Sequence, residues 1–213
     1  MANVMIPRDE TGKMLLPGKS EHERSWDFAS MSAVPSDIAV AAGTVTVATT
    51  AAGRGELRMV TGAVVGNTAK ITLPQVDLSF CETVALTLES IKTGATDCPE
   101  AVAIGLGASG IGAFIKKEAA NLYMYIKYNG SASATDTKFA LFAQGRAESI
   151  SVTFLINCRK KMLYILEGDQ VAAAVEMPAM ALGLITPDFT ITTNTAATKT
   201  ATVSRIRLTT RVN

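Results

Sequence analysis

Apolar and polar residues alternate along residues 150–177, and two polar breaks divide this stretch into three runs. In the first run, Ile150, Val152, Phe154 and Ile156 share one face, and Ser151, Thr153 and Asn157 share the other. Met162–Leu166 is apolar on both faces, and Val171, Val175 and Met177 resume the alternation. The breaks are Cys158–Lys161 and Glu167-Gly168-Asp169. A period of two between turn sequences predicts three consecutive antiparallel strands joined by tight turns.

The rest of the chain from Trp26 onward repeats this pattern in short segments rich in Thr, Val, Ala and Gly. Turn sequences such as Gly66-Asn67 and Asn129-Gly130 separate the segments. The predicted strands are Trp26–Val34, Thr44–Thr49, Glu56–Thr61, Thr68–Leu73, Val76–Ile91, Ala101–Leu106, Leu122–Tyr128, Lys138–Ala143, Ile150–Asn157, Lys161–Glu167, Gln170–Met177, Phe189–Thr193 and Thr200–Val212. Strands this short and numerous predict an all-β fold, an antiparallel two-sheet jelly-roll sandwich in which each sheet buries one face against the other.

The last predicted strand has one apolar and one basic face. Ile206, Leu208 and Val212 share the first face, and Arg205, Arg207 and Arg211 share the second. The first face is therefore expected in the core, and the second at solvent or an interface.

The segment 111–128 fits both a helical stripe and a strand. Its tyrosines favour a strand that spans Leu122–Tyr128.

Residues 1–25 differ from the rest, with clustered charge and two short apolar patches, each followed by a proline. The patches are Val4-Met5-Ile6 and Met14-Leu15-Leu16, followed by Pro7 and Pro17. Proline biases the preceding residue toward extended backbone. We therefore expect an extended N-terminal arm over 1–25 that anchors to neighbouring subunits, and a sandwich domain over 26–213. A floppy terminus is the alternative.

Composition excludes several classes of protein. The chain has 20 basic and 19 acidic residues, a net charge of +1, which argues against nucleic-acid binding by a basic surface. Residues 1–25 lack the long apolar run of a secretory signal, and no window approaches a membrane span. We therefore expect synthesis in a reducing cytosol and no membrane insertion. Cys81, Cys98 and Cys158 form no CxxC pair, and buried free thiols are the expected state.

Motifs that carry chemistry are weak. Gly105-Leu106-Gly107-Ala108-Ser109-Gly110 matches the dinucleotide-binding glycine pattern, but the strand–helix–strand context and the following acidic residue are missing. The single histidine, His22, lies in the arm, where a nucleophilic site is not expected. Zinc and calcium ligand spacings and a strand-borne carboxylate pair are missing. The sequence therefore predicts no enzymatic activity, no catalytic residue, no cofactor and no metal.

A few side chains are candidates for ligand contact. Tyr123 and Tyr125 are two residues apart in a predicted strand, and Trp26 is the lone indole. Aromatic rings stack on sugar rings, so these three are candidate glycan-binding residues, with core or interface packing as the competing role. The basic turn Arg159-Lys160-Lys161 could contact phosphate or anionic glycans, although charged turns also serve solubility.

The run Ile150–Met177 resembles the central hairpins of the concanavalin A-like lectin/glucanase sandwich, including laminin-G-type domains. The closing segment Ser204–Thr210 (SRIRLTT) is similar to that family's last strand, which pairs near the first, so Trp26–Ala29 would be its partner. The hydrolytic members' acidic cluster is missing, and calcium-binding lectin loops are not matched. The resemblance therefore implies the fold but not the hydrolytic activity.

In style, the chain also resembles structural proteins of tailed-bacteriophage virions, which join an arm to a Thr/Ala/Gly/Val-rich sandwich. This predicts a non-enzymatic virion component, such as a capsid decoration, head fibre or tail adhesin, made in the host cytoplasm. Its partners would be other virion proteins, copies of itself and host surface glycans. The alternative is a carbohydrate-binding, lectin-like module that recognises cell-surface glycans. A glycosidase is disfavoured because paired carboxylates are missing.

Overall fold

The computed structural model describes backbone and side chains for residues 21–92, 151–176, 182–193 and 196–212. It describes backbone alone for residues 4–5, 20, 93, 102–105, 112–118, 121–127, 137–140 and 150. Within these residues the fold consists of strands and two short 3-10 helices, η1 (Phe28–Ser30) and η2 (Leu78–Phe80). No described helix is long and apolar enough to cross a membrane.

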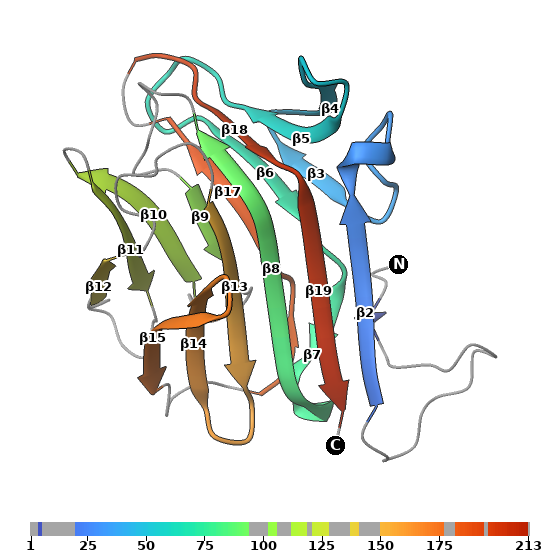
Figure 1. Cartoon of the computed structure of the whole chain (residues 1–213), viewed down its shortest axis with the longest axis vertical. Coiled ribbons are helices and arrows are strands. Elements are labelled where there is room, and N and C mark those ends of the chain that lie inside the picture. Colours follow the sequence, from blue (N-terminus) through green and yellow to red (C-terminus); the bar gives the residue numbers. More distant parts are fainter. Residues whose placement is uncertain are drawn as a thin grey trace.

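One layer is a nine-stranded antiparallel sheet, which occupies the front of Figure 1. Its strands are β15 (Gln170–Glu176), β14 (Met162–Glu167), β13 (Ile150–Asn157), β8 (Cys81–Thr93), β18 (Thr200–Val203), β5 (Gly55–Val60) and β4 (Thr44–Thr49), with β19 (Arg205–Val212) on β8 and β2 (Ser20–Asp27) on β19. The longest strand, β8, pairs with β13 on one side and with both β19 and β18 on the other.

The second layer is a seven-stranded antiparallel sheet. Its strands are β12 (Thr137–Ala140), β11 (Asn121–Lys127), β10 (Gly112–Glu118), β9 (Val102–Gly105), β17 (Asp188–Thr192), β6 (Thr68–Thr72) and β3 (Ala39–Ala42). A small third sheet joins β1 (Val4–Met5), β7 (Gln75–Asp77) and β16 (Leu184–Ile185).

A single buried cluster joins the two layers. The nine-stranded sheet contributes Leu86, Leu88, Phe154, Ile156, Leu163, Ile206 and Leu208, and the seven-stranded sheet contributes Ala69, Ile71, Phe189 and Ile191. These residues recur at every second position because alternate side chains of a strand point to the same face. The arrangement confirms the predicted all-β, two-sheet antiparallel sandwich.

The nine-stranded sheet forks at Ser204. The strands β18 and β19 follow one another along β8 in one continuous register, from Ala201 opposite Thr93 to Arg205 opposite Glu89. On the side away from β8 the partner changes. There β19 pairs with β2, which ends at Asp27 opposite Arg205, and β18 pairs with β5, where Leu57 lies opposite Val203. The Phe28 N–H donates to the Ser204 carbonyl at 3.1 Å, and η1 then carries the chain away.

A bulge in β8 lies beside the fork. Val152 of β13 faces Leu88, whereas Ile150 faces Ile91, so β8 carries one extra residue between them. Ser90, within the bulge, has a φ of +53°, and its N–H donates to the Ser151 Oγ at 3.0 Å. Positive φ is uncommon for a residue with a Cβ, and bulges sharpen the local twist of a strand.

Most predicted strands are confirmed, and their errors have local causes. The strand predicted at Trp26–Val34 instead begins at Ser20 and ends at Asp27, because the Asp27 carboxylate caps η1 by accepting from the Ala29 N–H at 3.1 Å. The strand predicted at Val76–Ile91 is broken by η2 in the same way, with Asp77 as the cap. The segment predicted as one strand at Thr200–Val212 is divided at Ser204 into β18 and β19, and the strands β3, β10 and β16 were not predicted.

The glycine-rich motif does not begin a helix in the described residues. Gly105 ends β9, and β9 pairs antiparallel with β10, with Gly105 opposite Gly112. An antiparallel pair is not the strand–helix unit that a dinucleotide requires. The strand predicted at Leu122–Tyr128 is confirmed by β11, which pairs in register with β10 from Gly112 opposite Lys127.

The predicted arm is described only in part. Val4 and Met5 form β1, which pairs parallel with β7 of the same chain, and Ile6, Met14, Leu15 and Leu16 lie outside the described residues. Residues from Ser20 belong to β2, so the sandwich begins inside the 1–25 range assigned to the arm. Anchoring of the arm to neighbouring subunits stays a prediction.

Two cysteines lie in the core as free thiols, as predicted: Cys81 and Cys158 are 6% and 2% exposed. Cys98 lies outside the described residues. Burial raises the pKa of the Cys81 thiol to about 12, with smaller effects from Cys158 and Asp77. Burial likewise raises the pKa of the Cys158 thiol to about 11.

We predict that a thiol-alkylating reagent at pH 8 leaves Cys81 and Cys158 unmodified in the folded protein, because only the thiolate reacts and both thiols stay protonated. Peptide mass spectrometry would assign the label site by site, with the same protein in denaturant as the positive control. Rapid native labelling of either residue would contradict their burial.

We predict that Gly55→Ala destabilises the fold by about 1–3 kcal/mol, the usual cost of overpacking. A Cβ on Gly55 would lie 2.0 Å from the Phe28 carbonyl oxygen and 3.1 Å from that of Met31, so η1 would have to move. Gly183→Ala is the matched control, since its Cβ would meet nothing within 4 Å. Equal unfolding free energies in urea for the two variants would contradict the close approach.

Candidate functional site

A hollow of about 480 Å³ opens where the nine-stranded sheet forks, and we call it the fork hollow. Its lining comes from the end of β2, the β4–β5 turn, the β8 bulge and the β18–β19 junction. The lining residues are Asp27, Ala29, Thr50, Ala51, Ala52, Arg54, Gly55, Glu56, Glu89, Ser90, Lys92, Ser204 and Arg205. This volume lies within the range usual for small-molecule sites.

Strand alternation places charged side chains at this end of the sheet. Ile206 and Leu208 of β19 are fully buried, so Arg205 and Arg207 project from the opposite, outer face. On β8, Leu88 is buried and Glu89 projects outward, directly opposite Arg205 in the register. The basic outer face predicted for the last strand is therefore confirmed in β19, and the neighbouring strand β8 places Glu89 beside it.

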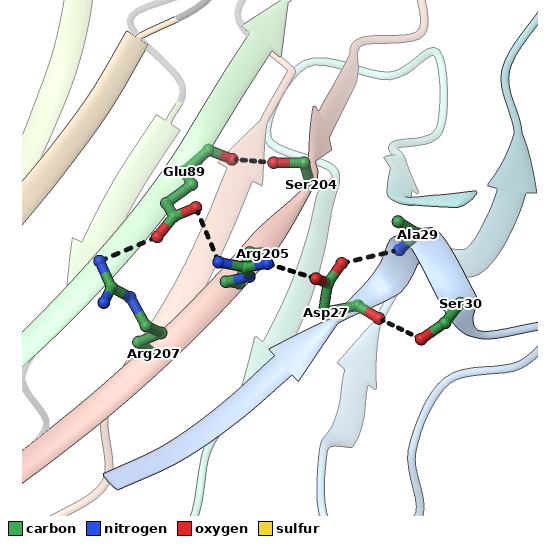
Figure 2. A network of polar contacts seen from close by, with 7 residues as sticks. All are labelled: Asp27, Ala29, Ser30, Glu89, Ser204, Arg205 and Arg207. Atoms are coloured by element: carbon green, nitrogen blue, oxygen red, sulfur yellow. Dashed lines mark hydrogen bonds and ion pairs between the residues drawn. The ribbon is translucent and has the colours of Figure 1, made fainter. Parts of the chain in front are cut away.

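The charged groups form a continuous network (Figure 2). The Arg205 guanidinium donates to the Asp27 carboxylate and approaches the Glu89 carboxylate at 3.6 Å. Glu89 also accepts from the Arg207 Nη2 at 2.9 Å. The hydrogen bond from Arg205, with a smaller one from the Ala29 N–H, lowers the pKa of Asp27 below its ordinary value. The hydrogen bond to Asp27 raises the pKa of Arg205 in turn.

A second ion pair lies on the other side of the fork hollow. The Lys92 Nζ donates to the Glu56 Oε1 at 2.6 Å, which joins β8 to β5. Each of the three carboxylates that line the hollow, Asp27, Glu56 and Glu89, is therefore ion-paired. Arg54 differs, since among the described residues its guanidinium has no hydrogen-bond or ion-pair partner, although its charge helps to lower the pKa of Asp27.

Small residues leave the space open. The β4–β5 turn closes with the Thr50 N–H on the Arg54 carbonyl at 2.7 Å and the Gly53 N–H on the Thr50 carbonyl at 2.9 Å. Gly53 has a φ of +75°, which glycine adopts without strain. Besides Thr50 and Arg54, the turn contributes only the alanines Ala51 and Ala52 to the lining.

This arrangement suits polar binding better than catalysis. The described residues of the lining include no histidine, cysteine or aromatic side chain, and their carboxylates are held by cations. A general acid or base needs a group free to exchange a proton near neutral pH. Within the described residues, no group of three or more His, Cys, Asp or Glu side chains is arranged to hold a metal ion.

The glycan-binding candidates from the sequence are not brought together at this site. Trp26 is buried at 4% exposure, and its indole N–H donates to the Asp37 Oδ1 at 2.9 Å, so the ring takes the core-packing role and presents no face to a sugar. Tyr123 and Tyr125 both lie in β11, opposite Lys116 and Phe114 of β10 in the register. Their side chains lie outside the described part of the chain.

The other polar candidates are also elsewhere. His22 lies in β2, opposite Thr210 of β19. Arg159–Lys161 forms the β13–β14 turn, where Lys161 has a φ of +51° and the Lys160 N–H donates to the Asn157 Oδ1 at 2.8 Å. Contact of this turn with phosphate or anionic glycans stays a prediction.

Sequence reasoning missed the fork hollow. No sequence motif singled out Glu89, and none marked Asp27 or Arg54 as its neighbours in space. One signal was available, because three arginines on one face of a strand favour acidic residues at neighbouring positions of the adjacent strands. The identity of those partners depends on the register of β8 and β2, which the sequence alone does not give.

Comparisons with known proteins establish the fold. No family model matches the chain, and no curated protein matches it. Among solved structures, the legume lectin-like domain from Entamoeba histolytica is 12% identical, with a TM-score of 0.59, over 80% of this chain and 88% of that one. The Emp47p carbohydrate recognition domain is 8% identical, with a TM-score of 0.61, over 86% and 93%. The VIP36 exoplasmic/lumenal domain, bound to Ca²⁺ and Man3GlcNAc, is 10% identical, with a TM-score of 0.56, over 81% and 84%.

The fold is a legume-lectin-like, concanavalin A-like β-sandwich. At these identities the similarity shows the fold alone and carries no residue assignment. The comparisons give no support to a phage virion protein.

We predict that Asp27→Asn reduces stability at neutral pH and that this loss shrinks as the medium is acidified. The pKa of Asp27 is lower in the folded protein than its unfolded-state value near 3.8. The ionised carboxylate therefore adds to the free energy of unfolding above that pH, and this stabilisation is lost as the pH falls through the folded-state pKa. The carboxylate is 42% exposed, so solvent screening keeps the effect modest. Thermal midpoints from pH 7 to pH 2 would test this, with Asp169→Asn on the exposed β14–β15 turn as the control. A constant difference across that range would refute the pairing.

Proposed function

We propose that this chain is a non-enzymatic, lectin-like carbohydrate-binding module. The observation that carries the proposal is similarity to lectin-like domains over 80% to 86% of the chain. One of those structures is a carbohydrate recognition domain, and another is bound to Man3GlcNAc. The ion-paired carboxylates of the fork hollow support binding over hydrolysis.

Two regions are candidates for saccharide contact. The fork hollow offers charged donors and acceptors around an open space. Tyr123 and Tyr125 lie in β11 and remain candidate stacking residues, whereas Trp26 is set aside because the core encloses it. The virion role predicted from the sequence, with its arm anchored on neighbouring subunits, has no support from the comparisons and stays a prediction.

We predict that the purified chain binds a subset of structures on a glycan array and hydrolyses none of them. Mass spectrometry of the array glycans after long incubation checks the second part, because hydrolysis would leave shortened products. An array without binding above background would contradict the proposed function, and cleavage would contradict its non-enzymatic nature.

The contribution of β11 is tested with Tyr123→Ala and Tyr125→Ala. Loss of one stacked aromatic ring is expected to weaken binding by about 0.5–1.5 kcal/mol if these rings contact sugar. Tyr164→Ala, in β14 of the other sheet, is the matched control. Unchanged array signals for both β11 variants would remove these tyrosines from the site without touching the fork hollow.

A further inference from the structure

We infer that the fork hollow binds the anionic group of an acidic saccharide, a carboxylate or a sulfate, with Arg54 as its principal cation. The inference rests on the proposed carbohydrate-binding function and names its ligand class. It is independent of Tyr123 and Tyr125.

The first reason is the charge balance of the hollow. Its lining has three cations, Arg54, Lys92 and Arg205, and three carboxylates. Every carboxylate is occupied, and Glu89 is held by Arg207 as well as by Arg205. The lining is therefore neutral as a whole, but its ion pairs use Lys92, Arg205 and the neighbouring Arg207, and they leave Arg54 as the surplus cation, without an ion-pair partner among the described residues.

The second reason is the position of that surplus. Arg54 is the last residue of the β4–β5 turn and lines the hollow together with Asp27, close enough for its charge to lower the pKa of that carboxylate. Asp27 is already engaged by Arg205 and by the Ala29 N–H. The N–H donors of the planar Arg54 guanidinium therefore remain available, and their arrangement suits a carboxylate or sulfate.

The third reason is what the walls lack. No described residue of the lining carries an aromatic ring, so these walls offer a neutral sugar no stacking. The turn that carries Arg54 adds the small side chains of Ala51 and Ala52 and one polar side chain, Thr50, to the lining. Charge is therefore the main source of selectivity in the hollow.

The fourth reason is the backbone around the hollow. Ser90 lines it at a φ of +53°, a conformation that costs free energy in a residue with a Cβ. Glu89 faces outward by strand alternation from buried Leu88, and the extra residue of the bulge shifts the alternation so that Ile91 is buried and Lys92 reaches Glu56 of β5. Bulges of this kind re-aim side chains at the edges of binding sites.

The test is a titration of the full chain, followed by protein NMR, with methyl β-glucuronide, glucose 6-sulfate and neutral methyl β-glucoside. We expect both acidic sugars to shift the amide signals of Ala51, Ala52 and Arg54 and to bind at least about tenfold more tightly than the glucoside. Arg54→Gln should remove that advantage. Arg54→Lys, which keeps the charge but not the planar fork, should retain part of it.

Arg58→Gln is the matched control, because Arg58 lies on β5 and is exposed but does not line the hollow. Thermal midpoints verify that each variant is folded. A preference for the carboxylate over the sulfate, or the reverse, identifies which anionic group the site takes.

The outcomes separate this inference from the proposed function. Array binding with no preference for acidic glycans, or with Arg54→Gln unchanged, overturns the inference and leaves the lectin-like function standing. Inorganic sulfate binding at Arg54 without binding of any glycan overturns the saccharide assignment. A blank array together with a flat titration overturns both.

Discussion

The structure depends on the backbone pairing of the long strand β8 with β18 and β19. These two strands also pair with β5 and β2 on their other side. The strand β8 keeps a single register against β18 and β19, whose outer partner changes from β2 to β5 at Ser204. The change is possible because η1 removes β2 from the sheet and because Gly55 admits the Phe28 carbonyl where any Cβ would collide. Both sheets then close over one core, because alternate residues of these strands remain buried on either side of the fork.

The same fork explains the candidate site. Where β2 leaves β19 and β5 begins on β18, the hollow opens between them, and the β4–β5 turn borders it with alanines. The charges there are consequences of strand alternation, since the residues between buried Leu88 and Ile91 and before buried Ile206 must face outward. Partly exposed ion pairs contribute little to stability, so their value here lies in fixing the geometry around one unpaired arginine.

Much of the fold was predictable from the sequence, but the site was not. The alternation from Ile150 to Asn157 gave β13 with its bounds, and the arginine face of Arg205–Arg211 was correctly assigned to the outside. Both are local patterns of side chains along one strand. The partnership of Asp27, Glu89 and Arg205 joins three segments far apart in sequence and depends on register. The burial of Trp26 likewise depends on the sheet that covers it.

The central claim is that the fork of the nine-stranded sheet is a binding site for an acidic saccharide. The most direct measurement is a crystal structure of the chain grown with an oligosaccharide that carries uronic acid. The account predicts density for the sugar in the fork hollow, with its carboxylate on the Arg54 guanidinium and the Asp27–Arg205–Glu89 network intact. A sugar bound only elsewhere on the sandwich, or an Arg54 side chain turned away from the hollow, would contradict it.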